Sequence, residues 1–188
     1  MTEQPLDPLT TALGVTDAVI AGVRPDQWML ATACPEWDVR QLVDHLVHGN
    51  WMFARALGET AAVRTGNSDD PLGDFRRSAR ALQAAFGSPG ALDRIVTVPF
   101  GRVPGGVALH LRVTELLVHG WDIARATHQP IAVPEDLAQQ ELAFAQARLP
   151  EVPAGRRPFG PPQPVPADAP AIDRLAACLG RPVTAESG

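Results

Sequence analysis

The sequence predicts an all-α protein, a bundle of four helices with one extra helix near the C-terminus. Three observations predict this fold class. Apolar residues recur at three- and four-residue intervals in five long segments. Proline or glycine lies at most of the boundaries between these segments. The chain has 188 residues, 45% of them hydrophobic, which is enough to bury a core without disulfides. We therefore expect one domain over residues 1–188.

The first and third helices each begin at an aspartate that can cap them. Asp7 and Asp70 stand at these positions, and a proline follows each of them. Gly87 is placed to end the third helix as a left-handed glycine. The predicted helices cover residues 7–23, 38–57 and 70–86.

Residues 88–106 interrupt the helical pattern. The run 94–100 is β-branched and alternating, and glycine and proline surround it. This pattern predicts a short β-hairpin or an extended crossover before the fourth helix. The fourth helix, residues 107–127, is apolar around most of its circumference, which indicates a place in the middle of the bundle.

The C-terminal part of the chain is expected to carry a fifth helix, residues 134–149. A proline-rich strap, residues 150–170, follows it, and its composition does not favour regular structure. A short helix is predicted over residues 171–180.

Charge and composition exclude several classes of function. The net charge is −5 with interspersed signs, which argues against a nucleic-acid partner. No apolar run approaches the roughly 20 residues needed to span a bilayer, and the N-terminus lacks the pattern of a signal peptide. We expect a cytoplasmic protein whose two cysteines, Cys34 and Cys178, are reduced thiols.

Polar side chains occur where the fourth helix should be buried. Glu115 and His119 are four residues apart, so they lie on one face, and Asp122 continues the same strip. Because burial of an unpaired carboxylate costs several kcal/mol, Glu115 needs a partner. His45 lies near the apolar face of the second helix, and a His₂Glu set from facing helices suits a zinc-type ion with an open position. The alternative is an ordinary Glu–His pair on a helix.

Two segments resemble the mycothiol-dependent maleylpyruvate isomerase family, part of the DinB/YfiT-like superfamily. The first is Cys34-Pro-Glu-Trp-Asp-Val-Arg-Gln-Leu-Val-Asp-His45-Leu, with Trp37 eight residues before His45. The second is Arg112-Val-Thr-Glu115-Leu-Leu-Val-His119-Gly-Trp-Asp122. The run over residues 173–182 is similar to the ending of short members of this group.

The resemblance implies a DinB-like four-helix bundle with a long crossover between the second and third helices. It also implies a divalent metal, usually zinc, held by His45, Glu115 and His119, and the use of mycothiol as a small thiol partner. The isomerase has a separate C-terminal domain, whereas here a short proline-rich segment follows the fifth helix. The substrate of the isomerase is therefore not carried over.

Three functions remain open. The first is a mycothiol-dependent transferase or isomerase, in which a thiolate attacks a small electrophilic substrate. The second is a metal-dependent hydrolase, and the third is a non-catalytic module that binds or senses a small molecule. Asp122 is expected to orient the His119 imidazole as a hydrogen-bond acceptor, or to accept a proton. A homodimer is one possible assembly.

Overall fold

The computed structural model describes residues 7–35, 37–60, 69–99, 101–148 and 159–183. The chain divides into two compact units, Met1–Ile131 and Ala132–Gly188. Within the described residues, the first unit holds four helices and a β-hairpin, and the second holds two helices. The single domain over residues 1–188 stays a prediction.

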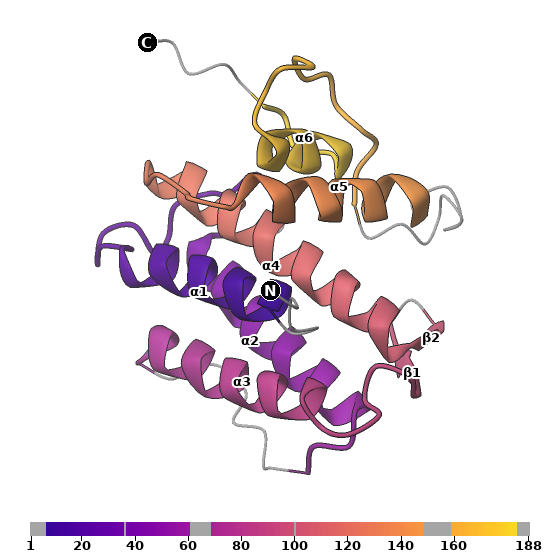
Figure 1. The fold of residues 1–188 in the computed structure, drawn as a ribbon. Coiled ribbons are helices and arrows are strands. Elements are labelled where there is room, and N and C mark those ends of the chain that lie inside the picture. The colour runs from indigo at the N-terminus through magenta and orange to yellow at the C-terminus, as the bar shows by residue number, and fades with distance from the viewer. Residues whose placement is uncertain (1–6, 36, 61–68, 100, 149–158, 184–188) are drawn as a thin grey trace. The chain divides into compact units, whose positions relative to one another are not determined.

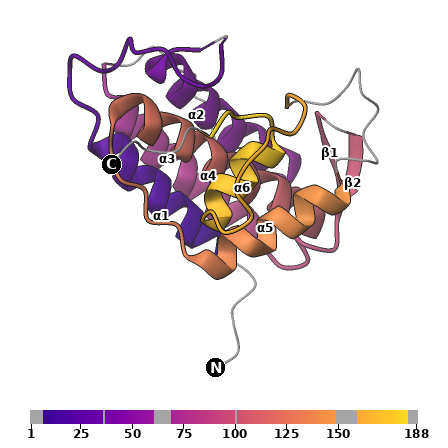
Figure 2. The same ribbon diagram turned by 90° about the horizontal axis from the view of Figure 1, so that it is seen from above.

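The first unit is a four-helix bundle (Figures 1 and 2). Helix α1 packs against α3 and α4, and α2 packs against the same two helices. An antiparallel hairpin of β1 and β2 precedes α4, with Val96 paired to Val103. The all-α, DinB-like fold class is thereby confirmed, including the hairpin before the fourth helix. The elements are α1 (Asp7–Ala21), α2 (Val39–Ala56), α3 (Pro71–Phe86), β1 (Ile95–Val98), β2 (Gly101–Pro104) and α4 (Gly105–Thr127).

Helix α4 forms the centre of this unit. It has 23 residues, and most of them are buried, from Gly105 to Thr127. The helix is apolar on nearly all sides because α1 and α2 pack on it from different directions. Among the described residues, no helix is long and apolar enough to cross a membrane.

Side-chain caps define where α2 and α3 begin. Asp38 accepts a hydrogen bond from the backbone N–H of Gln41, whose side chain accepts one from the backbone N–H of Asp38. Asp70 caps α3 through the N–H of Gly73. The left-handed glycine predicted at Gly87 is wrong, because this residue has φ −75° and continues in the right-handed helical region.

The second unit contains α5 (Glu135–Arg148) and α6 (Ala171–Cys178), which pack against each other. Residues 159–170 form neither helix nor strand, as expected for the proline-rich strap. Residues 149–158, which include the start of the predicted strap, lie outside the described residues. Helix α6 ends at Cys178, two residues before the predicted end.

We predict that Asp38→Ala lowers the free energy of unfolding by about 1 kcal/mol, since it removes the acceptor that caps α2. Asp38→Asn should restore most of this loss because asparagine caps a helix nearly as well. Urea unfolding measures both changes. Asp93→Ala, at an exposed aspartate of a turn, is the control and should shift stability by less than about 0.5 kcal/mol. Equal losses for Asp38→Ala and Asp93→Ala would contradict the role of the cap.

Candidate functional site

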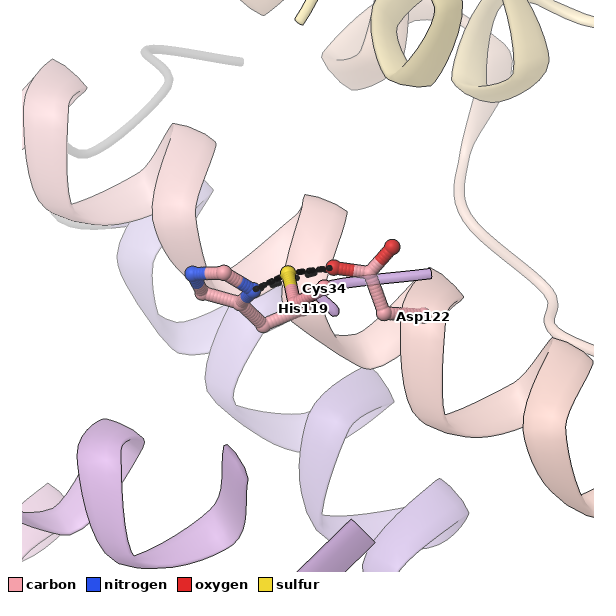
Figure 3. A group of neighbouring side chains, drawn as sticks. All are labelled: Cys34, His119 and Asp122. Atoms are coloured by element: carbon pink, nitrogen blue, oxygen red, sulfur yellow. Dashed lines mark hydrogen bonds and ion pairs between the residues drawn. The ribbon is translucent and has the colours of Figure 1, made fainter. Parts of the chain in front are cut away.

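Three chemically reactive side chains meet beside α4. The Sγ atom of Cys34 lies 3.3 Å from Oδ2 of Asp122 and 4.0 Å from Nδ1 of His119. The same oxygen of Asp122 lies 3.0 Å from Nδ1 of His119. Figure 3 shows the thiol and the carboxylate on one side of the imidazole ring. His119 and Asp122 are 3% and 0% exposed, so bulk water competes little for these contacts.

The contact with Asp122 fixes which ring nitrogen of His119 carries the proton. A carboxylate can only accept a hydrogen bond, so Nδ1 donates to Asp122 and a neutral ring keeps its lone pair on Nε2. Nε2 lies on the side of the ring away from Cys34 and Asp122 (Figure 3). Metal-binding histidines commonly have this arrangement, in which a carboxylate orients the ring and the other nitrogen binds the ion.

His45 lies next to His119. The two ring centroids are 5.1 Å apart, and the rings meet edge to face. Trp37 stacks on His45 with centroids 4.3 Å apart, and its ring is 6.1 Å from that of His119. Burial, followed by the charge of His119, lowers the pKa of His45 to about 4, although Glu115 opposes the shift. His45 is therefore a neutral imidazole near pH 7, which is the form that binds metals.

A short loop before α2 brings Cys34 and Trp37 to these histidines. The hydroxyl of Thr32 lies 2.8 Å from the carbonyl oxygen of Trp37 and accepts a hydrogen bond from the N–H of Cys34. An isolated β-bridge joins Ala31 to Asp38, which closes the loop at the start of α2. The loop geometry thus depends on a threonine that the sequence analysis did not single out.

Glu115 has a protein partner that the sequence analysis missed. Nη1 of Arg112 lies 2.8 Å from Oε2 of Glu115, one turn away on α4. Arg112 therefore offsets part of the cost of burying the Glu115 carboxylate, which the sequence analysis had assigned to a metal. The i,i+3 spacing in the string Arg112-Val-Thr-Glu115 could have indicated this pair. The contact involves one oxygen of Glu115 and leaves the other available as a ligand.

Arg112 is completely buried and joins α4 to α2. Its Nη2 donates to the carbonyl oxygen of Leu46 at 2.7 Å, and its Nε donates to Oδ1 of Asn50 at 3.0 Å. Gly49 makes room for the guanidinium, because a Cβ there would lie 2.4 Å from Nη1. Burial lowers the pKa of Arg112, whereas Glu115 raises it. The glycine, the amide and the backbone carbonyl hold the charge in one position.

Among the described residues, the structure brings one group of three possible metal ligands close together, and this group includes His119. The ligand atoms of Cys34, His119 and Asp122 lie within 4.8 Å of one another. In this group the atom of His119 that lies near the other two side chains is Nδ1. The predicted set of His45, Glu115 and His119 would use Nε2. His48, the other histidine of α2, is exposed on the surface. The predicted set stays a prediction. The two sets differ in the nitrogen of His119 that would bind the ion.

Buried imidazoles and carboxylates on packed helices are typical of metal-binding helical bundles. Comparison with known proteins names the family. The model of the mycothiol maleylpyruvate isomerase N-terminal domain matches residues 9–124, more than half of the chain. The chain belongs to this family. The matched residues include both groups of candidate ligands, and the second unit lies outside the match.

Two relatives match nearly the whole chain. They are "Uncharacterized protein Rv0738" and "Uncharacterized protein MT0763", from two strains of Mycobacterium tuberculosis. Each is 34% identical over 182 residues, which cover 95% of this chain and 100% of the relative. The similarity therefore includes the second unit. No solved structure matches this chain.

The space that Gly49 leaves for Arg112 predicts opposite effects for two helical glycines. Gly49→Ala should lower the free energy of unfolding by about 1–3 kcal/mol, because the new Cβ displaces a buried guanidinium. Gly14→Ala is the matched control in α1, where a Cβ meets nothing within 4 Å. It should raise stability by up to about 1 kcal/mol through helix propensity. If urea unfolding showed Gly49→Ala to be as stabilising as Gly14→Ala, the buried network would be wrong.

The low pKa of His45 predicts a loss of stability in acid for the metal-free protein. An unfolded histidine titrates near 6.5, whereas the folded His45 titrates near 4. The stability contributed by the neutral ring is complete above about pH 6.5 and falls as the pH drops toward 4. We expect a loss of about 1–2 kcal/mol, allowing for the partial exposure of the ring. Urea unfolding at a series of pH values measures it.

His45→Asn should flatten this part of the pH profile. His48→Asn, at an exposed histidine one turn further along α2, should change the profile only slightly, because His48 is the weakest of the influences on the pKa of His45. Equal profiles for the wild type and His45→Asn would contradict the assignment of the acid sensitivity to His45.

Proposed function

We propose that this protein is a zinc-dependent enzyme that uses mycothiol to attack a small electrophilic substrate. His45, Glu115 and the Nε2 atom of His119 would hold the metal. The observation that carries the proposal is the hydrogen bond from Nδ1 of His119 to Asp122, which orients the ring and keeps its second nitrogen as the lone-pair donor.

The donor set fits a divalent cation of the zinc type. Two imidazole nitrogens and one carboxylate oxygen are common ligands of catalytic zinc, and such sites keep a further position open. The low pKa of His45 favours its neutral form, so little free energy is spent on removing a proton before binding. The buried Arg112 holds one oxygen of Glu115, which fixes the carboxylate before any ion arrives.

The thiol chemistry is supported by the family. The description of the matched family model names mycothiol and maleylpyruvate isomerase. A zinc-type ion lowers the pKa of a thiol that coordinates it, which would favour the reactive thiolate. Trp37 covers His45 and is placed to exclude water from one side of the site. The hydrogen bond between His119 and Asp122 would orient the ring before a substrate binds.

A second ligand set is favoured by one observation. Cys34 lies close enough to His119 and Asp122 to form a site with one sulfur ligand. In that arrangement the metal would replace the hydrogen bonds that both groups make to Oδ2 of Asp122. We favour the first set because it keeps these hydrogen bonds.

Metal analysis of variants separates the two sets. Purified wild-type protein loaded with zinc should retain one ion per chain after dialysis, and His119→Ala should lose it. Cys34→Ser should retain the ion, because the thiol is not a ligand in the proposed set. Asp122→Asn should weaken binding by about 10–100-fold, as is usual for a partner that orients a metal-bound histidine. Loss of zinc in Cys34→Ser, with its fold intact by circular dichroism, would favour the sulfur site instead.

A second experiment tests the thiol. Zinc-loaded protein is incubated with mycothiol and a panel of small electrophiles, and the loss of free thiol is measured. The proposal predicts thiol consumption, or cis–trans isomerisation of an activated alkene, which depends on both mycothiol and zinc. Turnover of esters or amides without any thiol would favour the metal-dependent hydrolase. No turnover of either kind, with mycothiol bound, would favour a binding or sensing module.

A further inference from the structure

A pocket lies in the second unit, apart from the family match. It has a volume of about 490 Å³, within the usual range for small-molecule sites. Residues of α5, of α6 and of the segment 160–167 line it. Figure 1 shows this segment looping over α6. Every described residue that lines it belongs to Ala132–Gly188. The family model ends at residue 124, so the family match assigns this pocket no role.

The proline-rich segment is anchored to α6 and to the glycine that follows this helix. The backbone N–H of Gln163 donates to the carbonyl oxygen of Ala177 at 2.9 Å. Gly160 and Gly180 approach so closely that a Cβ on Gly180 would lie 2.7 Å from Cα of Gly160. Gly180 also has φ +88°, which favours glycine. Prolines between these anchors restrict φ and lower the entropy that a ligand must remove.

The lining combines an apolar wall with one cation. Arg174 is the charged side chain among the described residues that line the pocket. The other polar side chains are the amides of Gln146 and Gln163 and the thiol of Cys178. Burial raises the pKa of Cys178, so this thiol is neutral and adds no negative charge. The apolar members are Leu142, Pro162, Val165, Pro166 and Ala167.

Arg174 has hydrogen-bonding capacity that the described protein atoms leave unused. Its Nε is buried and has no hydrogen-bond partner among the residues that the structure describes. Its Nη2 lies 3.7 Å from Oε1 of Glu135, which is longer than a hydrogen bond. Glu135 is already engaged, because it accepts the N–H of Ala171 at 3.1 Å. A buried N–H of a cation without an acceptor is costly, and a ligand carboxylate would remove that cost.

We propose that this pocket binds a small monocarboxylate with an apolar body. The carboxylate pairs with the guanidinium of Arg174, and the apolar body packs against Leu142 and the prolines of the wall. A single charge matches the site better than a phosphate dianion, because one arginine faces the pocket and Glu135 lies near it.

The test uses octanoate as the probe and octan-1-ol as its uncharged counterpart. Alkylation of Cys178 by N-ethylmaleimide is followed on the full chain, and the peptide that contains Cys178 is quantified by mass spectrometry. Octanoate should slow this alkylation, and octan-1-ol should have a much smaller effect. Arg174→Gln should weaken the binding of octanoate by about tenfold or more, since it removes a charge-assisted hydrogen bond. Arg80→Gln, at an exposed arginine of α3, is the matched control and should behave as the wild type.

Glu135→Gln gives an effect of the opposite sign. It removes the carboxylate that competes for Arg174 while keeping an oxygen that can accept the N–H of Ala171. Octanoate should bind more tightly to this variant than to the wild type. Misfolding of the variant would not produce tighter binding. Equal protection by octanoate and octan-1-ol would show an apolar pocket without an anion site. No protection by either compound would show that the pocket binds no small acid, and both results overturn the proposal. Neither result depends on zinc or mycothiol.

Discussion

The buried guanidinium of Arg112 is the interaction on which the rest of the first unit depends. It binds the backbone of α2 at Leu46, the side chain of Asn50, and Glu115 on its own helix. A cation with no exposed surface is stable only when its donors are satisfied, so these contacts fix the separation and register of α2 and α4. The same two helices carry His45 and His119. The position of the candidate site is therefore a consequence of a buried charge that does not itself bind a metal.

Further contacts within the site fix the two imidazole rings. Asp122 orients His119, and Trp37 stacks on His45, so both imidazoles are held before an ion arrives. Such preorganisation lowers the entropic cost of metal binding and favours one tautomer of the ring. Cys34 lies on the opposite side of His119 from Nε2 (Figure 3). Its place next to Asp122 makes it a neighbour of the proposed metal site, with its S–H pointing to the carboxylate.

The helices and the hairpin could be predicted from the sequence because their signals are local. Asp70 caps α3 through the first turn of that helix, and the β-branched run before α4 alternates over a few residues. The contact between His119 and Asp122 could also be predicted from the sequence, since helical spacing determines it. The pairing of Arg112 with Leu46 and the approach of Cys34 to α4 were not, because they join segments 66 and 85 residues apart in the chain. Gly87 shows a further limit, since a glycine after a helix need not adopt the left-handed conformation.

We propose that Nε2 of His119, and not Nδ1, binds the metal. X-ray absorption spectroscopy of the zinc-loaded wild-type protein, without added thiol, tests it most directly. We expect nitrogen and oxygen ligands at about 2.0–2.1 Å and no sulfur shell, since Cys34 would stay hydrogen-bonded to Asp122. A sulfur shell at about 2.3 Å would place Cys34 on the ion, together with Nδ1 of His119, and would rule out the set of His45, Glu115 and His119.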